Sequence, residues 1–126
     1  MSKVSEDFVK KGASKISIDD VQKVLNKSDE IESKVNSSNV LKRLWEDIKL
    51  LFALIKAYIS KKYTKVPWWV ISAVAFSLLY LINPFDLIPD AIPVIGQLDD
   101  AAVIGICIKM IEKELLLFNE WKLANV

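Results

Sequence analysis

Four aspartates lie in the most irregular stretch of the chain, between residues 80 and 100, and their carboxylates are the groups best suited to chemistry. They are Asp86, Asp90, Asp99 and Asp100. Hard cations such as Mg²⁺ and Ca²⁺ take oxygen ligands, so these residues, with the amide of Asn83, have the right types for a cation site. Paired carboxylates also act as general acid and base. The sequence therefore allows a metal site or a carboxylate-based enzyme here.

The rest of the sequence makes both of these alternatives the weaker ones. The spacing of the aspartates is not that of an EF-hand loop, and the chain has no histidine to complete a zinc or di-iron site. No nucleophile stands beside a base, and no glycine-rich loop is present to hold a phosphate. We therefore expect no enzymatic activity, no cofactor and no small-molecule substrate, and keep the four aspartates only as weak candidates for binding a metal.

A structural role explains the same stretch. The pattern Asp-x-Ile-Pro occurs twice in succession, over residues 86–89 and 90–93. Each Asp can accept hydrogen bonds from the amides that follow it, and each Pro moves the preceding residue out of the helical conformation. An Asn-Pro pair before the repeat ends a helix, a glycine after it allows a left-handed turn, and an Asp pair starts the next helix. The predicted Pro/Asp-rich double turn is built from Asn83, Pro84, Asp86, Pro89, Asp90, Pro93, Gly96, Asp99 and Asp100.

A charge-free apolar segment precedes this double turn. Residues 66–85 carry no charge, and fifteen of these twenty residues are apolar. We expect a helix over residues 66–83, which at about 1.5 Å per residue is slightly short for the roughly 30 Å hydrocarbon core of a bilayer. Trp68 and Trp69 at one end and Tyr80 near the other are typical interfacial anchors. The segment is therefore either a transmembrane helix or the central helix of a bundle.

The distribution of charge favours membrane contact. The net charge of +1 argues against a nucleic-acid partner, but residues 40–65 carry seven Lys or Arg against two acids. Lys61, Lys62 and Lys65 lie directly before the apolar segment, where cations are attracted to anionic lipid headgroups. A second set, Lys42, Lys49 and Lys56, recurs every seven residues and is either a solvated helix face or a further membrane surface.

The remaining sequence predicts an all-α fold, a compact bundle of about four to five helices. The expected helices cover residues 5–11, ended by Gly12, then 18–36, 40–63, 66–83 and about 100–123. Ser17 begins the second with a capping box to Asp20, and Asn39 caps the third. Gly105 is expected at a close helix crossing. The only cysteine, Cys107, is expected to be a small core residue in a reducing cytoplasm.

We divide the chain into a polar helical N-terminal arm over residues 1–39 and a helical domain over residues 40–126. The first residues contain no apolar stretch, so we expect no secretory signal.

The residues from Tyr80 to Asp100 resemble the signature of the YkvA-like family of small, mainly bacterial proteins. The resemblance covers about residues 66–108 and implies an uncharacterised membrane or endomembrane protein with no established catalytic residues. The matching positions are Tyr80, Pro84, Asp86, Pro89, Asp90, Pro93, Gly96, Asp99 and Asp100.

These observations predict a non-enzymatic, membrane-associated helical protein on the cytoplasmic face, acting as a protein-interaction or adaptor module for an unknown protein partner. One alternative is a fully soluble cytoplasmic binding, regulatory or immunity protein. A carboxylate–metal enzyme is the remote alternative. The number of membrane crossings stays open, because a second crossing would place two aspartates deep in the bilayer.

Overall fold

The computed structural model describes residues 3–82 and 100–125, and its regular structure is entirely helical. This confirms the all-α class, whereas a bundle of four to five helices is not what the described residues form. They form eight helices: α1 (Lys3–Ala13), α2 (Ile18–Asn26), α3 (Ser28–Asn36), α4 (Asn39–Arg43), α5 (Trp45–Ile59), α6 (Trp68–Ile82), α8 (Asp100–Met110) and α9 (Glu112–Ala124). The predicted double turn before the C-terminal helix lies outside the described residues.

The larger number of helices arises because each of three predicted helices is interrupted at one residue. The breaks fall at Lys27, Leu44 and Ile111, whose φ and ψ angles are −109° and 25°, −97° and 6°, and −107° and 12°. The helical hydrogen bonds resume at once, since the amides of Ile31, Ile48 and Leu115 donate to the carbonyls of these same residues. Neither Pro nor Gly stands at a break, so packing rather than local sequence sets the bends.

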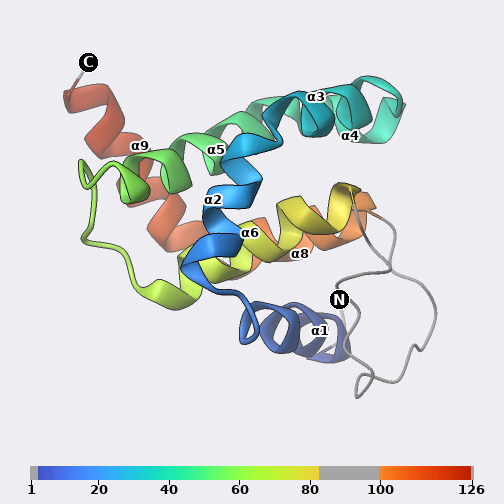
Figure 1. The fold of residues 1–126 in the computed structure, drawn as a ribbon, viewed down its shortest axis with the longest axis horizontal. Helices are drawn as coiled ribbons and strands as arrows, with labels where there is room; N and C mark the ends of the chain where they lie inside the picture. Colours follow the sequence, from blue (N-terminus) through green and yellow to red (C-terminus); the bar gives the residue numbers. More distant parts are fainter. Residues whose placement is uncertain (1–2, 83–99, 126) are drawn as a thin grey trace.

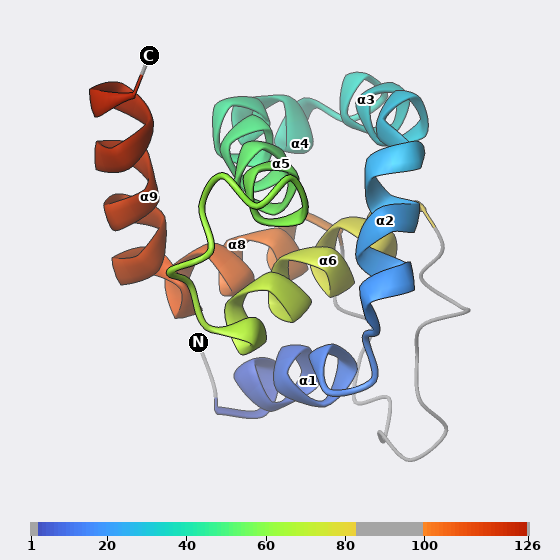
Figure 2. The ribbon, with the colours of Figure 1, turned by 60° about the vertical axis from the view of Figure 1, so that its left-hand side comes forward.

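Helix α6 lies at the centre of the described bundle (Figures 1 and 2). It contacts α1, α2, α3, α5 and α8, and every residue from Val70 to Leu81 is buried. Its fifteen residues extend over about 22 Å at 1.5 Å per residue. Among the described residues, no helix combines the length and apolar character needed to cross a membrane, so a transmembrane helix is not confirmed.

Helix α1 packs closely against α6, and this contact depends on Gly12. The prediction that Gly12 ends the first helix is wrong, since α1 continues to Ala13. A Cβ built on Gly12 would meet Cδ1 of Phe76 at 2.6 Å and other atoms of that ring closer still. The centre of the Phe8 ring lies 5.8 Å from that of Phe76 and 5.7 Å from that of Tyr80, and both contacts are edge-on. Gly12 is therefore a packing residue, and its missing side chain lets α1 reach the Phe76 ring.

Gly105 differs from Gly12, although both lie inside helices. In the part of the chain that the structure describes, nothing lies within 4 Å of a Cβ built on Gly105. Among the described residues no helix therefore crosses close to this glycine, contrary to the expectation.

Two other expectations concern local features. Ser17 and Asp20 form the expected capping box at the start of α2. Helix α4 is instead capped by Ser38, whose hydroxyl accepts a hydrogen bond from the amide of Leu41, so the prediction of Asn39 as the cap is wrong by one residue. Cys107 is fully buried, as expected of a core residue.

Candidate membrane-contacting site

The connection between α5 and α6 turns sharply at Lys61. The amide of Lys62 donates to the carbonyl of Ala57 at 2.9 Å, and the amide of Lys61 donates to that of Tyr58 at 3.1 Å. This pair of bonds is the Schellman arrangement that ends many helices, and it needs one residue with positive φ. Lys61 holds that position with φ 64°, where glycine is usual. The turn thus keeps an exposed lysine in a conformation that costs a non-glycine residue free energy.

The rest of the connection is fixed by residues that alternate between the core and the surface. Tyr63 and Val66 are buried, whereas the intervening Lys65 is exposed. The centre of the Tyr63 ring lies 5.1 Å from the ring centre of Phe118 and 5.1 Å from that of Trp121, both in α9. Burial raises the pKa of the Tyr63 hydroxyl, and the nearby charge of Glu114 raises that pKa further. Because Tyr63 is held in this aromatic cluster, the lysines on either side of it point into solvent.

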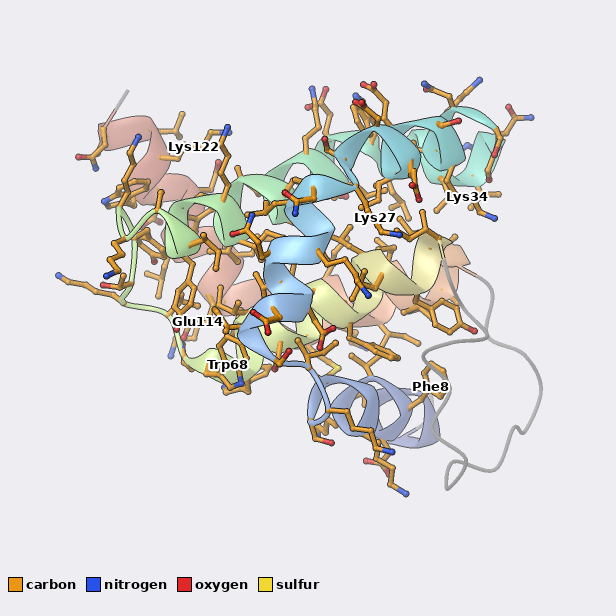
Figure 3. The ribbon with its side chains drawn as sticks, viewed as in Figure 1. Phe8, Lys27, Lys34, Trp68, Glu114 and Lys122 are labelled. Carbon is orange, nitrogen blue, oxygen red and sulfur yellow. The ribbon has the colours of Figure 1, made fainter. Side chains whose placement is uncertain are left out.

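Two tryptophans at the start of α6 are exposed next to these lysines. Trp68 is 40% exposed and Trp69 is 49% exposed, although the twelve residues that follow them are buried. The Trp68 ring lies 6.2 Å from that of Tyr58, which connects it to α5. Figure 3 shows Trp68 at one end of α6, far from Phe8 at the other. We name Lys61, Lys62, Lys65, Trp68 and Trp69 the α5–α6 corner.

All five corner residues are predicted membrane-surface residues, and all five are exposed at one corner of the fold. Indoles that are apolar over most of their surface but carry an N–H suit the lipid–water interface. Exposed ammonium groups beside them suit anionic headgroups. The corner therefore has the chemistry of an interfacial anchor.

A depression of about 640 Å³ lies on one side of the corner, between α1, α6 and α8. We call it the α1–α6 groove. It is lined by Glu6, Lys10, Ala13, Ser14, Trp68, Trp69, Ser72, Ala73 and Met110.

A second depression, of about 650 Å³, lies between α2 and the end of α5, and Lys61 also lines it. It includes Ile18, which is 51% exposed and adds an apolar side chain to the surface next to the corner. Sequence reasoning missed Ile18. No local signal identifies it, because only the packing of α2 against α5 brings it there.

The signature positions are covered only in part. Tyr80 is buried in α6, with its ring 6.0 Å from that of Phe76. Asp100 is the first residue of α8. The others lie outside the described residues: Asn83, Pro84, Asp86, Pro89, Asp90, Pro93, Gly96 and Asp99.

The candidate cation site formed by the four aspartates therefore stays a prediction. Within residues 3–82 and 100–125, no group of three or more His, Cys, Asp or Glu side chains is arranged to hold a metal ion.

Comparison with known proteins gives two matches. A family model described as "Protein of unknown function (DUF1232)" matches residues 70–106. The chain is also 30% identical over 82 residues to the Uncharacterized membrane protein YkvA of Bacillus subtilis (strain 168), over 65% of this chain and 77% of that relative. The chain belongs to the YkvA-like family. No solved structure matches it.

The match to the family model lies on α6, α8 and the residues between them. Residues 70–106 begin just after the two exposed tryptophans, run through the buried part of α6 and end within α8. The resemblance found in the sequence is confirmed, and the part of it that the structure describes is the central pair of helices.

Proposed function

We propose that this protein is a non-enzymatic helical module that attaches to the cytoplasmic face of an anionic membrane through the α5–α6 corner. One observation carries the proposal. The only residues of α6 before its buried stretch are two exposed tryptophans, and three exposed lysines precede them in the connection from α5. The relative from Bacillus subtilis, which is named a membrane protein, supports the membrane association in this proposal.

The expected affinity is modest and depends on salt. Each lysine near an anionic surface contributes about 1 kcal/mol, so the three at the corner contribute about 3 kcal/mol together. The indoles add interfacial contact, whereas the buried stretch of α6 stays in the protein core. Because the lysines are exposed, their attraction to lipid is screened over a Debye length of about 8 Å at physiological ionic strength. Attachment is therefore reversible.

As an adaptor, the protein would hold its partner with the N-terminal arm, residues 1–39. The apolar side chains of this region that face α6, such as Val21, Val24 and Ile31, are buried. The outward side chains are largely charged, and a partner would therefore bind through polar and charged contacts. The partner's identity does not follow from this chemistry.

A fully soluble regulatory or immunity protein is the second candidate. It is favoured by the enclosed position of α6, whose apolar residues from Val70 to Leu81 are covered by neighbouring helices. A carboxylate–metal enzyme remains the remote third candidate.

Flotation with lipid vesicles separates the first two candidates. We expect the purified protein to float with phosphatidylglycerol-containing vesicles and to remain in the lower fractions with pure phosphatidylcholine. Substituting Lys61, Lys62 and Lys65 together with Gln, or Trp68 and Trp69 together with Ala, should abolish flotation at physiological salt.

The matched control replaces Lys42, Lys49 and Lys56 with Gln, which removes the same charge from α4 and α5. This variant should float as the wild type does. Equal loss in both triple variants would show that only net charge matters, and absence of wild-type flotation would favour the soluble candidate.

A further inference from the structure

The α1–α6 groove exists because small side chains face each other along part of the seam between the two helices. Helix α1 crosses over α6, and Phe8 contacts Tyr80 on one side of the crossing. On the other side, Ser14 and Ala13 line the groove together with residues near the start of α6. The helices touch where Gly12 meets Phe76. Nearer the start of α6 the facing residues are alanines and serines, and they leave the groove of about 640 Å³. This volume lies within the roughly 300–1,000 Å³ of typical ligand sites.

The inner wall of the groove suits hydrocarbon. Trp68, Trp69 and Met110 supply apolar surface, and the flexible thioether of Met110 adapts to irregular shapes. The hydroxyl of Ser72 donates to the carbonyl of Trp69 at 3.1 Å, so its proton is already used within the helix. A ligand in the groove therefore meets mainly carbon atoms and few available hydrogen-bond donors.

The rim of the groove adds a cation. Lys10 is exposed and lies on α1 one helical turn after Glu6, which is only partly exposed. A lysine ammonium serves as a point charge for phosphate. Trp68 and Trp69 belong both to this groove and to the α5–α6 corner, so the groove opens on the same corner that would rest on a membrane. A lipid in that membrane could enter it without crossing water.

We propose that the α1–α6 groove binds one acyl chain of a phospholipid, with the lipid phosphate at Lys10. This proposal rests on the proposed membrane attachment and deepens it, since it assigns the corner a bound lipid as well as a surface contact. Apolar walls and continuity with the corner favour an amphiphile over a soluble polar metabolite. The Glu6 carboxylate also lines the groove, but Lys10 is the more exposed of the two charges and therefore the one that an anionic headgroup meets at the rim. The two indoles would flank the chain where it leaves the bilayer.

A monomeric single-chain lipid tests the groove without a membrane. Lauroyl lysophosphatidylglycerol is titrated below its critical micelle concentration and followed by calorimetry, with dodecyl maltoside as an uncharged amphiphile of the same chain length. We expect saturable binding of one lysolipid and weaker binding of the maltoside. Lys10→Gln should bring lysolipid affinity down to that of the maltoside, whereas Lys15→Gln, a neighbouring exposed lysine outside the groove lining, should leave it unchanged.

A second experiment fills the groove with a larger side chain. Ser14 is exposed, so a phenylalanine there can cover the groove without entering the core. Ser14→Phe should weaken lysolipid binding about tenfold or more by excluding the chain. Circular dichroism melting of the variant confirms that it is folded.

Three results would overturn the proposal: no saturable lysolipid binding, wild-type affinity in Ser14→Phe, or equal binding of the two amphiphiles that Lys10→Gln does not alter. Vesicle flotation distinguishes failure of the lipid-binding proposal for the groove from failure of the proposed membrane attachment. Ser14→Phe should still float, because the corner residues are unchanged. Flotation without lysolipid binding refutes the groove alone, and absence of wild-type flotation refutes the membrane attachment.

Discussion

Substituting Ala for Gly at two positions should change stability in opposite directions, because the two glycines meet different surroundings. Gly12 lies inside α1 with the ring of Phe76 in the space of a Cβ, and Gly105 lies inside α8 with open space around it in the described structure. Alanine is favoured over glycine in a helix interior by about 1 kcal/mol at either site. The space around the added methyl group therefore decides whether each substitution stabilises or destabilises the protein.

At Gly12 the added methyl group must displace α1 or the Phe76 ring. Overpacking a core in this way costs about 1–3 kcal/mol, and partial loss of an edge-on contact with Phe8 adds about 0.5–1.5 kcal/mol. After the helix-propensity gain is subtracted, Gly12→Ala should lower the free energy of unfolding by about 1–3 kcal/mol. Gly105→Ala should raise it by about 0.5–1 kcal/mol.

Urea unfolding followed by far-UV circular dichroism measures both changes. The midpoint should fall for Gly12→Ala and rise for Gly105→Ala, with an unchanged slope m. The overlap itself is tested by a double-mutant cycle with Phe76→Leu, which replaces the ring with a smaller aliphatic side chain. In that background Gly12→Ala should cost at least about 1 kcal/mol less than in the wild type. Equal stability of Gly12→Ala and wild type, or no coupling to Phe76→Leu, would refute the close approach of α1 to α6.

Two further predictions concern single residues. Lys61→Gly relieves about 1–2 kcal/mol of strain in the left-handed conformation and costs about 0.5–1 kcal/mol through the greater entropy of the unfolded chain, so it should raise the urea midpoint while weakening vesicle flotation. Lys62 has no positive φ, so Lys62→Gly should not stabilise the protein. A stabilised Lys62→Gly variant would contradict this account of the turn. Burial raises the pKa of Cys107 to about 12, with a smaller opposing effect from a hydrogen bond with Ser77. The unfolded thiol ionises near pH 8.5, so its contribution to stability is complete below that pH and is lost as pH rises toward 12. Cys107→Ala should remove this part of the alkaline decline in urea midpoint, and an identical decline in both proteins would contradict it.

Local signals in this sequence predict the parts of the fold that depend on neighbours in the chain. The capping box of Ser17 and Asp20 forms as expected because both partners lie within one helical turn. The helical regions follow from apolar periodicity for the same reason. The breaks at Lys27, Leu44 and Ile111 could not be predicted, since each residue continues an unbroken helical pattern. The helices on either side of the last two breaks pack against different neighbours: α5 packs against α6 and α4 against α8, while α8 packs against α6 and α9 against α5.

The candidate site divides in the same way. Lys65 and Trp68 are close in sequence, so their joint exposure at one corner could be expected from their spacing. Ile18 and Lys10 reach the neighbourhood of that corner from other helices, and no pattern in the chain reports such an approach. At Gly12 a local pattern gave a wrong prediction. A glycine near the end of an apolar stripe predicts a helix end, whereas here it serves a contact with a ring 64 residues later in the chain.

The burial of α6 limits how a membrane can meet this fold. A charge-free helix that is apolar on all sides fits either a bilayer or the centre of a bundle, and its sequence is the same in both cases. Here the side chains from Val70 to Leu81 are already covered by α1, α2, α3, α5 and α8. Lipid along the side of α6 would have to replace contacts such as those of Phe8 with Phe76 and Tyr80. Replacing protein carbon by lipid carbon gains little hydrophobic free energy, because both are apolar. A membrane that binds this fold intact therefore meets α6 at its start, where Trp68 and Trp69 are exposed, and the proposed attachment is a contact with one end of the helix.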